Sequence, residues 1–251
     1  MRSNRIPILN IEIDNLTKEE LLKDLTGGVL ITPNVDHLMK LQKDKDFYKL
    51  YQKADYITLD SQIVKLALRF LGTPAKELIT GSDFLPSFYK YHKDNPSIKI
   101  FLLGAAPGVA HVAMHRINKK VNRKIIVGTY SPPFNFEKSE KECNKIIEII
   151  NKSDANVLAV GIGAPKQEKW IFKFRNKLSK IKIFMAVGAT IDFEANKIQR
   201  APKFIRTIYL EWLFRLIKEP KRLWKRYLID DIPFIWLIIK QKLNFYKNPF
   251  E

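Results

Sequence analysis

The stretch NVLAVGIG (residues 156–163) shows the pattern on which the chain is built: an unbroken apolar run that ends in a glycine-rich turn. Short runs of this kind are typical of strands buried on both faces of a parallel sheet. Similar short, mainly apolar runs occur in IKIFLLG (98–104), KIIVGTY (124–130), IKIFMAVG (181–188), GVLIT (28–32) and DYITL (55–59), with helical patterns between them, and three of the six runs end in a glycine-rich turn. The sequence therefore predicts an α/β fold with a Rossmann-like, mostly parallel sheet and helices on both faces.

The amino-terminal part adds three elements to this sheet. RIPILNIEI (5–13) is predicted to form a strand or an edge hairpin. A helix opened by Thr17 follows, because Glu20 stands three residues later, as in a capping box. Residues 35–53 are predicted to form one helix.

Length and composition limit the class of protein. The 251 residues are 46% hydrophobic, which suits one large core or one domain with an appendage. Cys143 is the one cysteine, so an internal disulfide and a thiol-rich metal cage are excluded. The amino terminus carries Arg2 and Arg5 but no apolar run long enough for a signal peptide, so we expect a cytoplasmic protein.

The net charge of +18 predicts an anionic partner. Residues 197–251 hold 13 Lys and Arg against five Asp and Glu, and three of the four tryptophans. In EPKRLWKRYL (219–228), a helix would place its basic residues on one side, namely Lys221, Arg222, Lys225 and Arg226. Such a face could bind RNA, an anionic membrane or a phosphate. We expect a core of residues 1–196 and a basic amphipathic helical appendage of residues 197–251.

Membrane association is predicted to be peripheral, on the inner face of the cell membrane. The longest apolar run, IPFIWLII (232–239), is far shorter than the roughly 20 residues of a spanning helix. Basic residues beside tryptophans suit an anionic membrane surface. The apolar residues of the appendage also predict self-association, as a homo-oligomer, when it detaches from the core.

Candidate site residues follow the predicted strands, because ligands of such sheets lie beyond the carboxyl ends of the strands. Glycine-rich turns at these ends, such as GAAPG from Gly104, offer backbone N–H groups to phosphates. Asp60 ends DYITL and is a candidate for acid–base chemistry or, alternatively, the cap of the next helix. The other candidates at strand ends or in the turns beyond them are Thr32, Asn34, Tyr130 and Gln167.

Cofactor and metal motifs are weak. GIGAPK has Lys166 where a dinucleotide fingerprint needs a third glycine, so we expect no nicotinamide cofactor. DKD (44–46) falls inside the predicted helix 35–53, where residues two apart point in different directions. The histidines are predicted to lie at the surface and to bind no metal; they are His37, His92, His111 and His115. We therefore expect no cofactor and no metal site.

An ordered set of motifs resembles the WecG/TagA/CpsF family of bacterial glycosyltransferases over nearly the whole chain. The motifs are TPN (32–34), ADYITLD (54–60), TGSDF (80–84), FLLGAAPGVA (101–110), GIGAPKQE (161–168), VGATIDF (187–193), RAP (200–202) and, most specific, LEWLFRLIKEPKRLWKRYL (210–228). Three positions depart from the family. Ser61 and Asn196 stand where glycine is usual, and Leu78 stands where arginine is usual.

The resemblance implies an inverting enzyme that needs no metal. It would move an N-acetylhexosamine, N-acetylmannosamine in the best-known branch, from UDP to undecaprenyl-diphosphate-linked N-acetylglucosamine in wall teichoic acid synthesis. Asp60 would be the general base and Thr32, Asn34 and Gln167 would line the donor or acceptor pocket. Side chains of the appendage would close over the diphosphate, at Arg215, Arg222 and Lys225.

Two other functions fit parts of the sequence. The charge and the aromatic residues among basic ones also suit a nucleic-acid-binding protein, although the apolar tail favours lipid, and we expect no nucleic-acid partner. A sugar-nucleotide-binding domain without catalysis is the second alternative. Binding to anionic vesicles but not to RNA at about 0.15 M salt separates the lipid from the nucleic-acid interpretation. Release of UDP that depends on an acceptor separates an enzyme from a domain that only binds.

Overall fold

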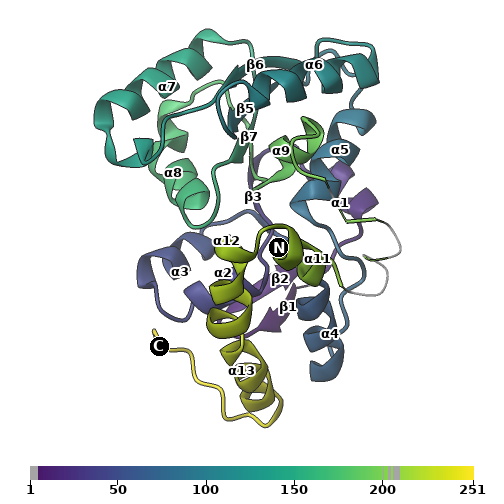
Figure 1. Cartoon of the computed structure of the whole chain (residues 1–251), viewed down its shortest axis with the longest axis vertical. Coiled ribbons are helices and arrows are strands. Elements are labelled where there is room, and N and C mark those ends of the chain that lie inside the picture. Colours follow the sequence, from purple (N-terminus) through teal and green to yellow (C-terminus); the bar gives the residue numbers. More distant parts are fainter. Residues whose placement is uncertain (1–4, 200, 203–204, 206–209) are drawn as a thin grey trace.

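A six-stranded, all-parallel sheet forms the centre of the computed structural model (Figure 1), which describes residues 5–199, 201–202, 205 and 210–251, without the side chains of Glu211, Arg215 and Arg222. Its strand order is β4-β3-β8-β7-β5-β6. All six predicted strands are present: β3 (Gly28–Ile31), β4 (Tyr56–Ile57), β5 (Ile100–Gly104), β6 (Ile126–Tyr130), β7 (Val157–Gly161) and β8 (Ile183–Ala186). The prediction of a parallel sheet is confirmed.

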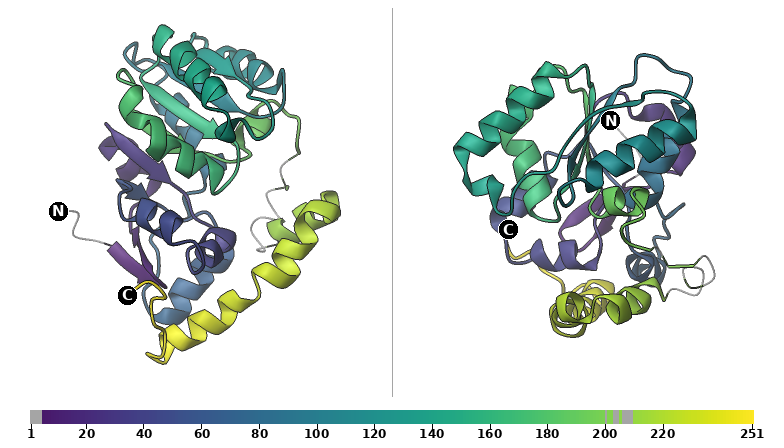
Figure 2. Two further views of the ribbon diagram at one scale, coloured as in Figure 1. Left: turned by 90° about the vertical axis from the view of Figure 1, so that its left-hand side faces the viewer. Right: turned by 45° about the horizontal axis from the view of Figure 1, so that its top comes forward.

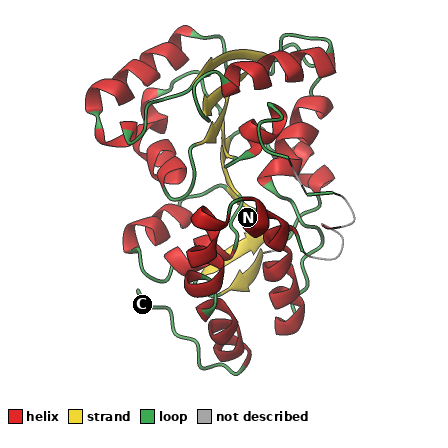
Figure 3. Ribbon diagram, in the orientation of Figure 1, coloured by secondary structure: helices red, strands yellow, loops and turns green. Residues whose placement is uncertain are grey.

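Helices cover both faces of the sheet, as predicted (Figure 3). Alternate residues of β5 show this: Phe101 and Leu103 belong to one buried cluster, whereas Ile100 and Leu102 belong to the other. The first cluster includes residues of α2 (Val35–Lys40), α3 (Lys45–Tyr51), α4 (Gln62–Leu71), α7 (Glu140–Lys152) and α8 (Lys166–Phe174). The second includes residues of α1 (Lys18–Asp24), α5 (Gly81–Tyr91), α6 (Val109–Val121) and α9 (Thr190–Glu194). Short 3-10 turns occur at η1 (Phe136–Lys138) and η2 (Arg175–Lys177).

β3 is the first strand of this sheet along the chain and β8 is the last, and the two strands pair side by side. The helix after β3, α2, packs on one face of the sheet, and the helix after β8, α9, packs on the other. Where the chain leaves adjacent parallel strands toward opposite faces, open α/β sheets bind ligands beyond the carboxyl ends of those strands. The fold thus directs attention to the residues after β3 and β8.

The amino-terminal predictions are confirmed in two cases and wrong in one. β1 (Arg5–Ile8) and β2 (Ile11–Asp14) form an antiparallel hairpin, and Thr17 and Glu20 form the capping box of α1. The single helix predicted over residues 35–53 is instead two helices, α2 and α3. Asp44 is the N-cap of α3, where its side chain accepts from the backbone N–H of Phe47. DKD therefore begins a helix and is not inside one.

The carboxyl-terminal segment is helical, as predicted: α11 (Glu211–Lys218), α12 (Pro220–Lys225), the single π-helical turn η3 (Arg226–Asp230) and α13 (Pro233–Lys242). Figure 2 shows α12, η3 and α13 following one another along one side of the molecule. α13 packs against α2 and α4, and its Phe234 and Ile238 are buried in the first cluster. The division into residues 1–196 and 197–251 remains a prediction. No helix in the described ranges is long and apolar enough to cross a membrane.

Candidate active site

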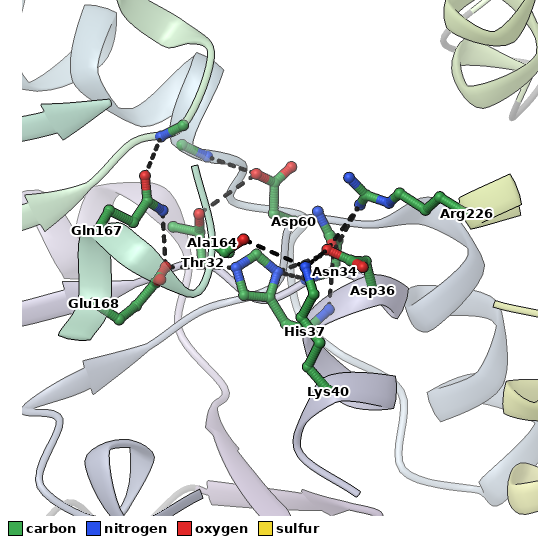
Figure 4. Close-up of polar contacts among 12 residues, drawn as sticks. Thr32, Asn34, Asp36, His37, Lys40, Asp60, Ala164, Gln167, Glu168 and Arg226 are labelled. Carbon is green, nitrogen blue, oxygen red and sulfur yellow. Dashed lines mark hydrogen bonds and ion pairs between the residues drawn. The ribbon is translucent and has the colours of Figure 1, made fainter. Parts of the chain in front are cut away.

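Asp60 lies just beyond β4, close to polar groups at the end of β3 and at the start of α5 (Figure 4). Its half-buried carboxylate accepts from the hydroxyl of Thr32, directly after β3, and from the backbone N–H of Gly81, the first residue of α5; both distances to Oδ2 are 3.4 Å. The alternative interpretation of Asp60 as a helix cap is wrong. Ser61 is the N-cap of α4, and its hydroxyl accepts from Val64 N at 3.4 Å. Asp60 is therefore held at the strand ends by groups other than α4.

Gln167 lies in the first turn of α8, the helix that connects β7 to β8. Only 3% of its surface is exposed. Its Oε1 accepts from the backbone N–H of Gly188, which follows β8, at 3.2 Å, and its Nε2 donates to Oε1 of Glu168 at 2.8 Å. These two bonds fix the orientation of the Gln167 amide beside the carboxyl end of β8.

Asn34 is the N-cap of α2 and forms a capping box with His37. Its Oδ1 accepts from the backbone N–H of His37 at 3.3 Å, and its own backbone N–H lies 3.2 Å from Nδ1 of His37. The predicted surface position of His37 is wrong, since it is 6% exposed. Its Nε2 lies 3.5 Å from Oε1 of Glu168. A buried chain of contacts therefore connects Asn34 to Gln167 through His37 and Glu168 (Figure 4).

Arg226 reaches this group from the carboxyl-terminal segment. Its Nη2 donates to Oδ1 of Asn34 at 3.1 Å and lies 3.7 Å from Oδ2 of Asp36. Lys40 bonds the same Asp36 oxygen at 2.7 Å. Asp231, close to Arg226 at 3.9 Å, is largely desolvated, and this burial raises its pKa to about 6 despite the opposing effect of Arg226. The segment is thus joined to the strand-end cluster by charged contacts.

The remaining predicted site residues are not joined to this cluster by the contacts of the described residues. Gly104 ends β5, where φ is +130° and a Cβ would lie 2.3 Å from the oxygen of Gly161, so close packing of β5 on β7 explains its glycine. Tyr130 ends the edge strand β6 and donates to Glu142. Lys225 is exposed at the end of α12. The side chains of Arg215 and Arg222 lie outside the described part of the structure, so their roles remain predictions.

Metal ligands are sparse in the part of the chain that the structure describes. It contains no group of three or more His, Cys, Asp or Glu that could hold a metal ion. His111 and His115 lie exposed on α6, and their Nε2 atoms are 2.8 Å apart.

Comparison with known proteins identifies the family of this chain. The family model described as "Glycosyl transferase WecG/TagA/CpsF family" matches residues 6–248. The chain belongs to this family. It is 26% identical over 257 residues to the N-acetylglucosaminyldiphosphoundecaprenol N-acetyl-beta-D-mannosaminyltransferase of Staphylococcus aureus (strain MRSA252), covering 96% of this chain and 95% of that protein. The enzyme of the same name from strain MW2 is 25% identical, with the same coverage.

As a member of the WecG/TagA/CpsF family, the protein is a glycosyltransferase. The motifs that suggested this family in the sequence, TPN, ADYITLD and GIGAPKQE, supply Thr32, Asn34, Asp60 and Gln167. The fold brings these four residues to the carboxyl ends of β3, β4 and β7, and the loop after β8, the strand between β3 and β7, contacts Gln167. A carboxylate, a hydroxyl and two amides at one edge of the sheet are groups that can hydrogen-bond sugar hydroxyls.

Sequence reasoning missed the residues behind this cluster. His37 and Glu168 are polar residues on helices, and such residues are usually solvent-exposed, so their burial was not predicted. Asp36 was missed for the same reason. The available signal was local: Asn34 and His37 have capping-box spacing, and Glu168 stands directly after Gln167.

Proposed function

We propose that this glycosyltransferase moves an N-acetylhexosamine from a UDP-sugar to undecaprenyl-diphosphate-linked N-acetylglucosamine, and that the sugar moved is N-acetylmannosamine. The transfer inverts the anomeric carbon and uses no metal. The reaction would serve wall teichoic acid synthesis. The names of the Staphylococcus relatives support the acceptor and the sugar. The observation that carries the proposal is the position of Asp60, whose carboxylate accepts hydrogen bonds from Thr32 and from the backbone of Gly81 beyond the carboxyl ends of the strands.

Asp60 acts as the general base in this proposal. Sugar transfer requires removal of a proton from the attacking hydroxyl of the acceptor as that oxygen forms its bond to the anomeric carbon. The carboxylate takes that proton and the UDP leaves with the electron pair of the broken C–O bond. Attack from the face opposite UDP inverts the anomeric carbon. Thr32 and the N–H of Gly81 hold the carboxylate in place.

The leaving diphosphate is neutralised by cations of the carboxyl-terminal segment. Arg226 already reaches Asn34, and Lys225 precedes it on the same segment. Guanidinium groups bind phosphate oxygens through two parallel hydrogen bonds, which favours arginines for this role. Arg215 and Arg222 are assigned the same role from the family resemblance.

An apolar surface beside the site supports attachment to the membrane that holds the acceptor. On α13 the exposed side chains are Ile235 and Trp236, and on the adjoining α4 they are Ile63, Leu66 and Phe70. Lysines border them; Lys242 lies 5.7 Å from the ring of Phe70 and Lys240 lies 5.5 Å from that of Trp236. We name this the α4–α13 surface. Apolar and aromatic side chains with basic neighbours suit the interface of an anionic bilayer.

Replacement of Asp60 tests the proposal against a neighbouring control. Asp60→Asn keeps the hydrogen-bond acceptor but removes the base, so acceptor-dependent UDP release should fall roughly 10²–10⁴-fold. Binding of the UDP-sugar and the thermal midpoint should stay near the wild-type values. Ser61→Ala removes the cap of α4 and should cost about 1 kcal/mol of stability while turnover persists. Near-normal turnover by Asp60→Asn would contradict the proposed base.

A further inference from the structure

Glu168 is a buried carboxylate that the proposed reaction does not use. Its side chain has no exposed surface. A buried carboxylate is costly unless hydrogen bonds or charges compensate it. Here one oxygen, Oε1, accepts from Nε2 of Gln167 at 2.8 Å and faces Nε2 of His37 at 3.5 Å. Gln167 is itself a candidate site residue, and His37 contacts another, Asn34.

The imidazole of His37 needs this carboxylate to fix its proton. Its Nδ1 lies near two groups of Asn34: the backbone N–H, 3.2 Å away, and the side-chain Oδ1, 2.9 Å away. The first contact requires Nδ1 to accept and the second requires it to donate, so they do not determine the tautomer. On the other side of the ring, Nε2 faces a carboxylate oxygen. A proton on Nε2 makes that contact attractive, whereas a lone pair there would make it repulsive.

We propose that Glu168 is a positioning residue for the transfer reaction: its Oε1 holds the amide of Gln167 and a proton on Nε2 of His37, and through His37 it holds Asn34. On its other side the imidazole stays within hydrogen-bond distance of Asn34, with Nδ1 3.2 Å from the backbone nitrogen and 2.9 Å from Oδ1. The oxygen of Asn34 then faces donors from His37 N and Arg226. One buried oxygen thus orients both amides of the site. The idea rests on the proposed function, because it assigns Gln167 and Asn34 to the substrate pocket.

Two substitutions at Glu168 test the proposal in the full-length chain, with a UDP-sugar and a water-soluble analogue of the lipid-linked acceptor. Glu168→Met keeps the length of the side chain but removes the acceptor, so kcat/KM should fall roughly 10- to 100-fold as the two amides lose their orientation. Glu168→Gln keeps one acceptor oxygen and should lose only about threefold. A role in packing alone would leave Glu168→Met active, because apolar groups often replace buried charges without loss.

The matched control is Glu194→Met. Glu194 is also buried, and its Oε2 accepts from Lys120 at 2.6 Å and from the Tyr89 hydroxyl at 3.2 Å, but it belongs to α9 on the opposite face of the sheet. Its kcat/KM should stay near the wild-type value. Wild-type kcat/KM for a folded Glu168→Met would overturn the proposal, as would equal losses for the methionine variants at both positions.

A second measurement does not depend on activity or on a variant of Glu168. In the wild-type chain, ¹⁵N-edited NMR of the imidazoles, with the signal of His37 assigned through His37→Phe, should show a proton on Nε2. A lone pair on Nε2 would overturn the proposal even if Glu168→Met were inactive. If the wild-type protein transferred no sugar, the proposed function would fail while the NMR result still decided whether Glu168 holds His37.

Discussion

Ser61 and Asn196, two of the residues that depart from the family pattern, fit their local backbone. Ser61 replaces a usual glycine at the N-cap of α4, a position that serine serves better because its hydroxyl bonds Val64 N. Asn196 replaces a usual glycine with φ at +60°, a conformation that asparagine tolerates better than most residues. Leu78, where arginine is usual, packs against the first buried cluster. The first two changes therefore preserve local structure, and the third exchanges a charge for apolar packing.

Gly104 gives a prediction that separates structure from binding. Gly104→Ala should lower the free energy of unfolding by roughly 2–4 kcal/mol, because the new methyl would meet the Gly161 oxygen at a left-handed φ. Gly108→Ala is the control: φ is +81°, but no atom lies within 4 Å of its Cβ, so only backbone strain of about 1–2 kcal/mol applies. Chemical denaturation measures both. A Gly104→Ala chain that is stable but binds no UDP-sugar would support the predicted binding role.

At the scale of elements, the strands were easier to predict than the helices. Short apolar runs mark the strands, whereas the break between α2 and α3 contains neither proline nor glycine. It depends on Asp44, which caps α3 and bonds Lys169 of α8 at 2.6 Å, a contact from 125 residues away. The site was predictable where strand ends supplied it and not where helices bury polar residues, as at Glu168.

The junction of η3 and α13 should make stability depend on pH. Asp231 has a pKa of about 6 in the fold against 3.8 ordinarily, so the folded chain binds more protons between these values. Its stabilising contribution is present below about pH 4 and is lost as the pH rises through about 6. The thermal midpoint of Asp231→Asn, relative to wild type, should therefore rise between pH 5 and pH 7.

Thermal melts across that range measure the effect. Asp230→Asn removes a carboxylate from the next position and serves to subtract the general effect of a changed charge in this segment. A difference between Asp231→Asn and wild type that does not change with pH would show that burial does not raise the pKa of Asp231.

The α4–α13 surface gives a prediction for membrane attachment. Ile235 is 63% exposed on α13. Because burying one such side chain in lipid gains about 1.5–3 kcal/mol, Ile235→Glu should weaken binding to anionic vesicles at least tenfold. Turnover on a water-soluble acceptor should be unchanged. Val112→Glu, at a 46% exposed position on α6, is the control and should leave vesicle binding intact. Equal vesicle binding by Ile235→Glu and wild type would exclude this surface.

At the scale of the whole molecule, the class of the fold follows from the sequence but the order of its strands does not. Apolar runs separated by helices predict six parallel strands. Placing β8 beside β3 requires contacts between residues about 155 positions apart, such as Gly28 with Ile183, which no local pattern encodes. The same strand order puts β4 beside β3 and β7 beside β8, and so brings Thr32 to Asp60 and Gln167 to Gly188.

The carboxyl-terminal segment was predicted as an appendage, yet α13 contributes to the first buried cluster. Phe234 is 2% exposed between α2 and α4, and Gln241, near the end of α13, accepts from the backbone N–H of Leu9 at 2.8 Å. Contacts of this kind couple the stability of the helix to that of the core. The question of whether residues 197–251 form a separate unit is therefore energetic, and a pair of substitutions on α13 answers it.

Phe234→Ala should lower the free energy of unfolding of the whole chain by about 3–5 kcal/mol, the usual cost of emptying a buried phenylalanine site. Trp236→Ala, two residues away and 59% exposed, should change it by no more than about 0.5 kcal/mol. Denaturation followed by far-ultraviolet circular dichroism should show one transition, shifted only by the first change. If Phe234→Ala instead left the main transition in place and loosened only a minor one, α13 would unfold apart from the sheet, and the boundary near residue 196 would divide two energetic units.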